Sequence, residues 1–161
     1  IADGWLAIFF APGFADEQLG NVDTGRAVVG KTRAGFDLVA TIPLAGLRSI
    51  AEVLDGHLFG PDFLNTDRGT AVATFKSTKV EPEGDKSAKV TGDFTLNGVT
   101  KEVVLEVDLN QIAQHPMTGK ESVGFDAETE IKRTDFNLGQ FAPAVGDELD
   151  VQISIEASKA E

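Results

Sequence analysis

Apolar and polar residues alternate along most of this chain, and the alternation is clearest in its second half. Successive side chains of a strand point to opposite faces, so a period of two predicts strands that bury one face only. Over residues 89–96 the apolar face holds Val90 and Phe94, and Asn97-Gly98 follows at once. Both residues of that pair tolerate a positive φ, which a tight hairpin turn requires. The sequence therefore predicts a hairpin centred on this pair.

The same one-sided alternation recurs at residues 102–109, 123–132 and 149–158. A polar, solvent-exposed face on nearly every strand favours antiparallel pairing, because parallel sheets are usually covered on both faces. Earlier in the chain four less regular segments also qualify as strands, and these are Trp5–Ala11, Gly25–Gly30, Phe36–Ile42 and Ala71–Val80. The total is about eight strands.

One segment departs from the period of two. From Leu47 to Leu64 the apolar residues recur every three or four positions, as they do on one face of a helix. Ser49 is placed to cap the start of this segment, and Gly60-Pro61 interrupts it. The sequence therefore predicts a single helical insertion between two strands.

Antiparallel strands with one helical insertion either close into a barrel or stack as a sandwich. We favour an all-β fold, an eight-stranded antiparallel barrel over residues 1–161, with the insertion as a lid over one end. Closure at about eight strands leaves room for one ligand. The polar turn at residues 81–86 and the longer connection at residues 111–121 lack the character of domain linkers, so a single domain is expected.

Composition narrows the classes of function. The chain carries 14 basic and 26 acidic residues, and its net charge of −12 repels nucleic-acid phosphates and anionic lipid headgroups. It has no cysteine, which excludes disulfides, thiolate catalysis and thiolate metal sites. No apolar run approaches the roughly 18 residues of a membrane span. We expect a soluble chain without a nucleic-acid partner, in a mature or trimmed form that starts at Ile1 without a signal peptide.

Few residues are candidates for chemistry. His57 lies beside two apolar residues, where it either contacts a ligand or bonds the backbone, and His115 is expected in a solvated turn. Arg133 and Asp135 end a strand, and we expect an ion pair between them that fixes the following turn. Metal-ligand spacing, a phosphate-binding loop and a nucleophile elbow are all missing. The sequence predicts no catalytic residue, no metal site and no required cofactor.

The aromatic residues are 11 Phe and one Trp with no Tyr, so nearly all of them lack a polar group. Phe36, Phe75, Phe94 and Phe125 fall on predicted inward faces, and the helical insertion adds Phe59 and Phe63. Ordinary core packing explains each of them, and so does contact with an apolar ligand. The residues alone leave both interpretations open.

Several ordered segments resemble the motifs of the YceI-like family. Residues 55–64 (DGHLFGPDFL) and 74–78 (TFKST) resemble "HL-x-S-x-DFF … ATF-x-ST". Residues 90–101 (VTGDFTLNGVTK) resemble "VTGDLTIRGVTK", residues 131–136 (IKRTDF) resemble "INRSDFG", and residues 145–149 (VGDEL) also match. Together they cover Phe36 to the C-terminus.

Some positions differ from these family motifs. Gly60 replaces a usual Ser, Leu64 replaces the second Phe, and Asn137 replaces a Gly. The first strand also lacks the His-Ser pair with which family members usually open.

The resemblance implies a lipocalin-like barrel that binds polyisoprenoid chains, including isoprenoid quinones, in periplasmic or secreted proteins of bacteria. It places His57, Leu58, Phe59, Phe63 and Leu64 at the family's lid. Inward residues of the strands would line the tunnel, and the expected contacts are Phe36, Leu38, Phe75, Phe94, Leu96, Leu105, Val107, Phe125, Ile131, Phe136, Val151 and Ile153.

We therefore interpret the chain as a protein that binds, stores or transports a polyprenyl lipid or isoprenoid quinone without turnover. Burial of the chain would supply about 25 cal/mol per Å². One alternative is a barrel enzyme for a small apolar substrate, with His57 or Asp135 as acid or base. Another is a stress-linked interaction module without a pocket. Either a monomer or a homodimer is expected, because Phe9, Phe10 and Val104 are predicted to face outward.

Overall fold

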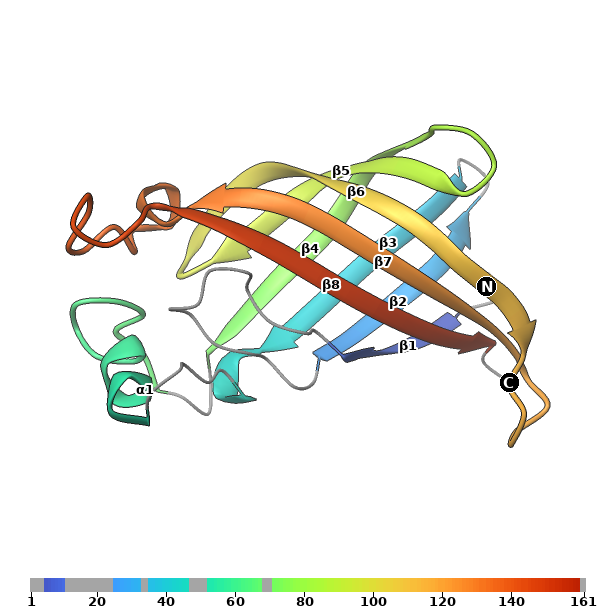
Figure 1. The fold of residues 1–161 in the computed structure, drawn as a ribbon, viewed down its shortest axis with the longest axis horizontal. Helices are drawn as coiled ribbons and strands as arrows, with labels where there is room; N and C mark the ends of the chain where they lie inside the picture. Colours follow the sequence, from blue (N-terminus) through green and yellow to red (C-terminus); the bar gives the residue numbers. More distant parts are fainter. Residues whose placement is uncertain (1–4, 11–24, 33–34, 47–51, 68–70, 160–161) are drawn as a thin grey trace.

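The structure, a computed structural model, describes residues 5–10, 25–32, 35–46, 52–67 and 71–159. Every strand pairs antiparallel with its neighbour in the chain, and β8 pairs with β1, so the sheet closes as a barrel (Figure 1). The elements are β1 (Trp5–Phe10), β2 (Gly25–Thr32), β3 (Gly35–Pro43), the 3-10 helix η1 (Leu44–Gly46), α1 (Glu52–Leu58), β4 (Val72–Pro82), β5 (Ser87–Leu96), β6 (Val99–Gln114), β7 (Glu121–Lys132), the 3-10 helix η2 (Arg133–Phe136) and β8 (Glu148–Lys159). The prediction of an all-β antiparallel sheet is confirmed.

The β5–β6 hairpin forms where the sequence predicts it. Asn97 and Gly98 have φ values of 52° and 73°, and Leu96 pairs with Val99 on either side of them. Two successive left-handed residues give a turn whose twist matches that of the strands. The predicted alternation is also confirmed, because residues 103, 105, 107 and 109 are buried or half-buried while residues 102, 104, 106 and 108 are exposed.

The predicted connection at residues 111–121 is wrong. Strand β6 continues to Gln114, and β7 starts at Glu121. The register shifts between Leu109 and Gln111, so Asn110 is an extra residue in a β-bulge. The bulge puts the apolar pattern out of phase and leaves Ile112 58% exposed, which hides the strand from a search for strict alternation.

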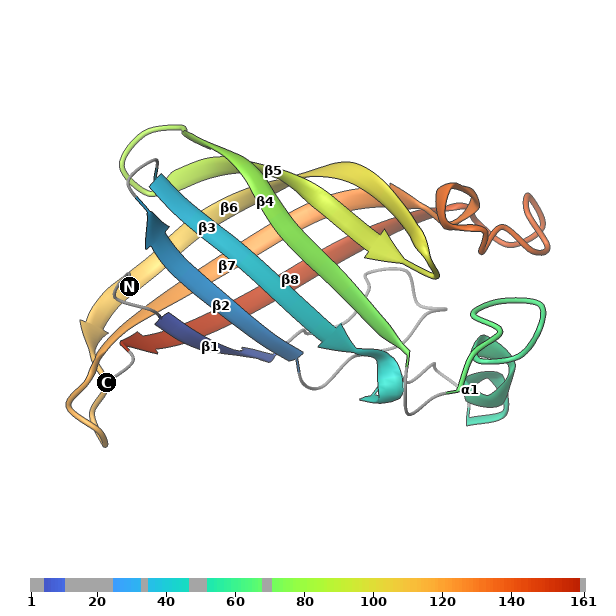
Figure 2. The same ribbon diagram turned by 180° about the vertical axis from the view of Figure 1, so that it is seen from behind.

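The helical insertion ends close to the interruption that the sequence predicts. Helix α1 has seven residues, and the chain then turns, with the Leu64 amide donating to the Leu58 carbonyl at 3.0 Å. The helix thus ends just before Gly60-Pro61, and turns follow it, so the predicted interruption at this pair is confirmed. Ser49, the predicted cap, lies outside the described residues. Figures 1 and 2 place α1 beside the end of the barrel where β3 stops and β4 begins.

Among the described residues the apolar core consists of three clusters of buried residues, and Phe94 packs against all of them. The first draws its members from β3 to β8 and includes Phe75, Leu105 and Ile155. The second lies at the α1 end and includes Leu44, Leu58, Leu64, Ala71 and Ala73, and the third consists of Ile131, Phe136 and Leu149. Within the described part of the chain, no helix is long and apolar enough to cross a membrane.

Candidate ligand-binding interior

The inward faces of β5 to β8 form a continuous apolar surface. Strand alternation points one side chain in two into the barrel, and these positions are almost all aliphatic or Phe. Several of them keep part of their surface accessible although they pack against the buried core, and they are Phe94, Val103, Val107, Leu109, Phe125 and Ile153. Side chains of a solid core are close-packed and buried, whereas the lining of an internal space keeps accessible surface.

Most of the predicted contact residues lie in this interior. Residues that belong to or pack against the central cluster are Leu38, Phe75, Phe94, Leu105, Val107, Phe125 and Ile153. Those in or against the cluster at the α1 end are Leu58, Phe59, Leu64, Phe94 and Leu96. Those in or against the third are Phe94, Leu96, Ile131, Phe136 and Val151. The structure therefore brings together residues that are more than a hundred positions apart in the chain, such as Leu38 and Ile153, as a closed sheet requires.

Two predicted contacts lie elsewhere, and the side chain of a third is not among those described. His57 is exposed, and its carbonyl accepts a hydrogen bond from the Gly60 amide at 3.0 Å. Phe63 is half-buried, with its ring 6.1 Å from that of Phe141. Phe36 lies in β3, but its side chain is outside the described residues. Contact of any of the predicted residues with a ligand stays a prediction.

Gly92 occupies a position in β5 where there is no room for a side chain. A Cβ atom at this position would lie 2.6 Å from the Lys76 carbonyl oxygen and would also overlap the Phe75 ring. Only glycine leaves room for that ring, so the Gly in the VTGD segment positions Phe75 in the central cluster. Opposite Gly92, the buried Ser77 hydroxyl accepts a hydrogen bond from the Leu38 amide at 2.8 Å, which links β3 to β4.

Arg133, at the start of η2, organises the connection between β7 and β8. Its side chain is 2% exposed and donates four hydrogen bonds to backbone carbonyls. Their acceptors and distances are Gly146 at 2.7 Å, Leu138 at 2.8 Å, Val145 at 2.9 Å and Gln140 at 3.3 Å. Asp135 is exposed instead of paired, so the predicted ion pair with Arg133 is wrong. Backbone acceptors carry no sequence signature, which explains why residue types suggested a carboxylate partner.

Asp147 has the role that the sequence assigned to Asp135. Its carboxylate accepts hydrogen bonds from the Thr134 amide at 2.8 Å and the Thr134 hydroxyl at 2.7 Å. These bonds, with smaller contributions from Arg133 and Lys132, hold the pKa of Asp147 below its ordinary value. The connection is thus held from both ends, by a buried guanidinium and by a capping carboxylate.

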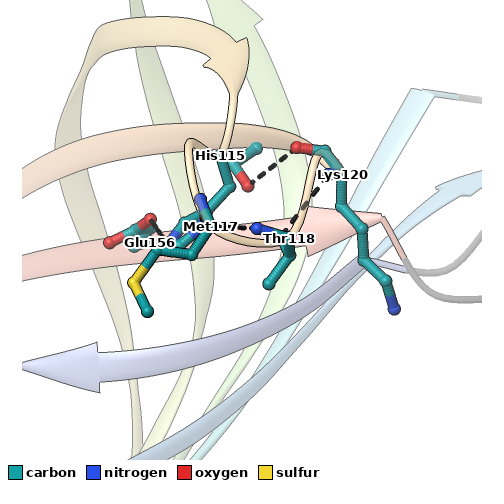
Figure 3. A network of polar contacts seen from close by, with 6 residues as sticks. His115, Met117, Thr118, Lys120 and Glu156 are labelled. Atoms are coloured by element: carbon teal, nitrogen blue, oxygen red, sulfur yellow. Dashed lines mark hydrogen bonds and ion pairs between the residues drawn. The ribbon is translucent and has the colours of Figure 1, made fainter.

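The remaining polar candidates lie on the outside. His115 Nδ1 faces the amides of Met117 (3.2 Å) and Thr118 (3.4 Å), which donate to it and stabilise the β6–β7 turn (Figure 3). Its Nε2 is 4.0 Å from the Glu156 carboxylate. Asp126 accepts hydrogen bonds from Ser154 and Asn110, which lower its pKa. Among the described residues no three His, Asp or Glu side chains converge as a metal site would require.

A family model of the YceI-like domain matches residues 13–157. This chain belongs to the YceI-like family. Over 102 residues it is 46% identical to Protein YceI of Shigella flexneri, an alignment that covers 63% of this chain and 52% of the relative. The chain thus spans about half the length of the curated relatives it matches.

Solved structures of YceI-like proteins share the fold. A crystal structure of a Campylobacter jejuni YceI protein has a TM-score of 0.74 and 28% identity, and the match covers 92% of this chain and 84% of that one. A domain from Saccharophagus degradans, described as a polyisoprenoid binding domain implicated in plant cell wall breakdown, has a TM-score of 0.61 and 14% identity. That match covers 99% of this chain and 96% of that one.

One departure from the YceI-like motif now has a physical reason. Asn137, where the family motif has Gly, caps η2 with a left-handed φ of 56°. Asparagine tolerates that conformation better than other residues with a side chain, so the turn keeps its geometry without glycine. This segment therefore keeps the left-handed backbone conformation that the Gly of the family motif readily adopts.

Proposed function

We propose that this YceI-like protein binds a long isoprenoid lipid, either a polyprenyl chain or an isoprenoid quinone, inside its barrel. The observation that carries the proposal is the continuous, partly accessible apolar surface of the inward faces, joined through Phe94. Transfer of a prenyl chain from water to such a surface gains about 25 cal/mol per Å² before ordering costs are subtracted. The protein would store or transport the lipid without changing it chemically and without a cofactor.

The family supports the same ligand class. The Saccharophagus degradans domain with this fold is described as polyisoprenoid-binding. In the present chain, the described residues of the interior are apolar and could contact a prenyl chain. A lipid carrier of this kind is needed where apolar molecules must cross water, and we extend the proposal to a periplasmic or secreted location.

The carrier would act as a monomer or a homodimer. Val104 is 43% exposed, whereas the side chains of Phe9 and Phe10 lie outside the described residues.

Helix α1 and the turns after it would form the lid. Leu58 and Leu64 project from this segment into the cluster with Leu44, and α1 lies beside this end of the barrel. His57 faces solvent on the same segment, so it would meet a ligand headgroup only outside the lid. The catalytic alternative gains no support from the described residues, because His57 and Asp135 are both exposed.

The binding proposal is tested by titration with anthraniloyl-labelled geranylgeraniol, a fluorescent prenyl alcohol. We expect saturable binding by the wild-type protein. Val107→Gln places an amide on the inward face and should weaken binding about tenfold, because the amide loses water without gaining a partner. Glu106→Gln, one residue away on the exposed face, is the matched control and should bind like the wild-type protein. Circular dichroism verifies that both variants fold.

Two results would contradict the proposal. One is a wild-type protein that shows no saturable signal with any prenyl alcohol. The other is equal binding by the folded Val107→Gln and Glu106→Gln variants, which would place the probe outside the barrel.

A further inference from the structure

Strands β6 and β7 are paired along only part of their length. Their ladder ends at the Glu106–Glu128 pair, although β6 stays paired with β5 from residue 99 and β7 stays paired with β8 to residue 132. In this described part of the wall, residues 99–105 and 129–132 therefore face each other without ladder bonds. We call these two segments the seam. Both ribbon views show the start of β6 curving away from the end of β7 (Figures 1 and 2).

Side-chain hydrogen bonds hold the seam. The Thr129 hydroxyl donates to the Val104 carbonyl at 2.8 Å, where a continuous ladder would have backbone bonds. At the end of the seam the Asn97 amide group donates to the Phe136 carbonyl at 3.0 Å. Segments held by few hydrogen bonds open at a lower free energy than a continuous ladder does. The seam is thus a point where the wall can separate without loss of the rest of the sheet.

A groove of about 330 Å³ follows the seam. Its rim is charged, and its apolar floor consists of Val103, Ile131 and Phe136. The Phe136 ring meets the Phe94 ring edge-on, with centroids 5.4 Å apart, and Phe94 packs against all three core clusters. The floor of the groove is therefore joined to the barrel interior through the contact between Phe136 and Phe94.

We propose that the seam is a lateral portal through which an apolar chain enters and leaves the barrel, an inference that rests on the proposed function. Beside α1, Leu44, Leu58 and Leu64 are buried in one cluster, so passage at that end of the barrel requires the cluster to come apart. Passage through the seam requires that the Thr129–Val104 and Asn97–Phe136 bonds break and that the side chains of Ile131 and Phe136 leave their cluster with Leu149, but no strand pairing is lost.

The rim also limits the headgroup that can pass. It carries three carboxylates against two ammonium groups, and these residues are Glu102, Glu130, Asp135, Lys101 and Lys132. The excess of negative charge disfavours an anionic headgroup, such as a phosphate, beside the portal. The cargo that fits is a prenyl chain with an uncharged polar headgroup, such as an alcohol or a quinone.

A crosslink across the seam tests the portal. The chain has no cysteine, so Val104→Cys/Glu130→Cys introduces the two required thiols at exposed positions that line the groove. Both thiols are joined with dibromobimane, and stopped-flow fluorescence follows anthraniloyl-labelled geranylgeraniol. We expect uptake and release about tenfold slower than in the same variant without the crosslink, with unchanged capacity. The control is Gln114→Cys/Glu121→Cys, an exposed pair in the ladder of the same two strands, where the crosslink should leave both rates unchanged.

A second variant opens the seam instead of closing it. Thr129→Val keeps the shape of the side chain but removes the donor to Val104, and release should become about fivefold faster. Amide hydrogen exchange reports on the seam without any ligand. We expect faster exchange at residues 129–132 than at residues 122–128, and a further increase in Thr129→Val.

The outcomes separate the two proposals. Wild-type protein that takes up no probe overturns both the function and the portal. Normal uptake with the same rates before and after the seam crosslink overturns the portal alone. Exchange at the seam as slow as in the neighbouring ladder also overturns it, whatever the result with the probe.

Discussion

Arg133 is a buried cation whose partners are backbone carbonyls. A guanidinium has five N–H donors in a rigid planar arrangement, so it can satisfy several carbonyls of one loop at once. Four backbone carbonyls between Leu138 and Gly146 accept hydrogen bonds from it and therefore all point toward the guanidinium. The side chain thereby determines the path of the loop between β7 and β8.

Substitution of this residue tests that role. Arg133→Met keeps much of the apolar stem but leaves four carbonyls without their donor, and we expect a loss of about 3 kcal/mol in the free energy of unfolding. Urea unfolding measures it. The neighbouring exposed residue supplies the control, since Asp135→Asn should change stability by less than about 0.5 kcal/mol. Equal stability of the two variants would show that the guanidinium is dispensable.

The lowered pKa of Asp147 implies a defined pH dependence. Because Thr134 bonds to the ionised carboxylate, the folded state favours ionisation more than the unfolded state does, where the pKa is near 3.8. The stabilisation is complete above that value and is lost as the pH falls through the lower folded pKa. We expect Asp147→Asn to be less stable than the wild-type protein at neutral pH and the difference to narrow below about pH 4. Unfolding curves across this range would contradict the account if the difference stayed constant.

At the scale of elements, the packing of β4 against β5 depends on Gly92, which pairs with Ser77 across the two strands. Gly92→Ala would drive Cβ against the Lys76 carbonyl and the Phe75 ring, and we expect a loss of about 2 kcal/mol or more. The matched control makes the same change in α1. No atom lies within 4 Å of the Cβ that Gly56→Ala would add, and the helix should gain up to about 1 kcal/mol. Thermal unfolding would contradict the account if both substitutions had the same sign.

Elements were predictable where local chemistry alone determines them. The hairpin at Asn97 and Gly98 and the alternating faces of β5 to β8 follow from turn conformation and strand geometry. The end of α1 at Leu58 agrees with the interruption predicted at Gly60-Pro61. The bulge at Asn110 could not be predicted, because it shifts the alternation by one residue. The carbonyl partners of Arg133 depend on tertiary structure, which no residue pattern records.

At the scale of the whole molecule, closure of the sheet decides which inward residues meet. Strand parity already assigned Val107 and Ala127 to the interior, and the structure pairs them directly across β6 and β7. Their different exposure could not be predicted, because it depends on how the opposite wall packs. Ala127 is 1% exposed, whereas Val107 is only half-buried. This difference separates a lining position from a packed one.

The two positions test whether the interior is hollow. We expect Val107→Phe to cost less than about 1 kcal/mol, because the larger ring enters accessible space, and to shorten the longest prenyl alcohol that the protein retains. Ala127→Phe should cost about 1–3 kcal/mol through overpacking. Denaturant unfolding and a length series of prenyl alcohols measure the two effects. Equal destabilisation by both substitutions would mean that side chains fill the barrel.

The central claim, that the barrel holds an isoprenoid lipid, is tested most directly by native mass spectrometry of protein purified without added lipid from a host that makes prenyl quinones and polyprenols. Organic extraction then identifies the released molecule. The account predicts a mass increment equal to one prenyl lipid, which disappears on extraction and is recovered as a quinone or polyprenol. Protein that emerges without any lipid, and stays empty after incubation with prenyl quinones and polyprenols, would contradict it.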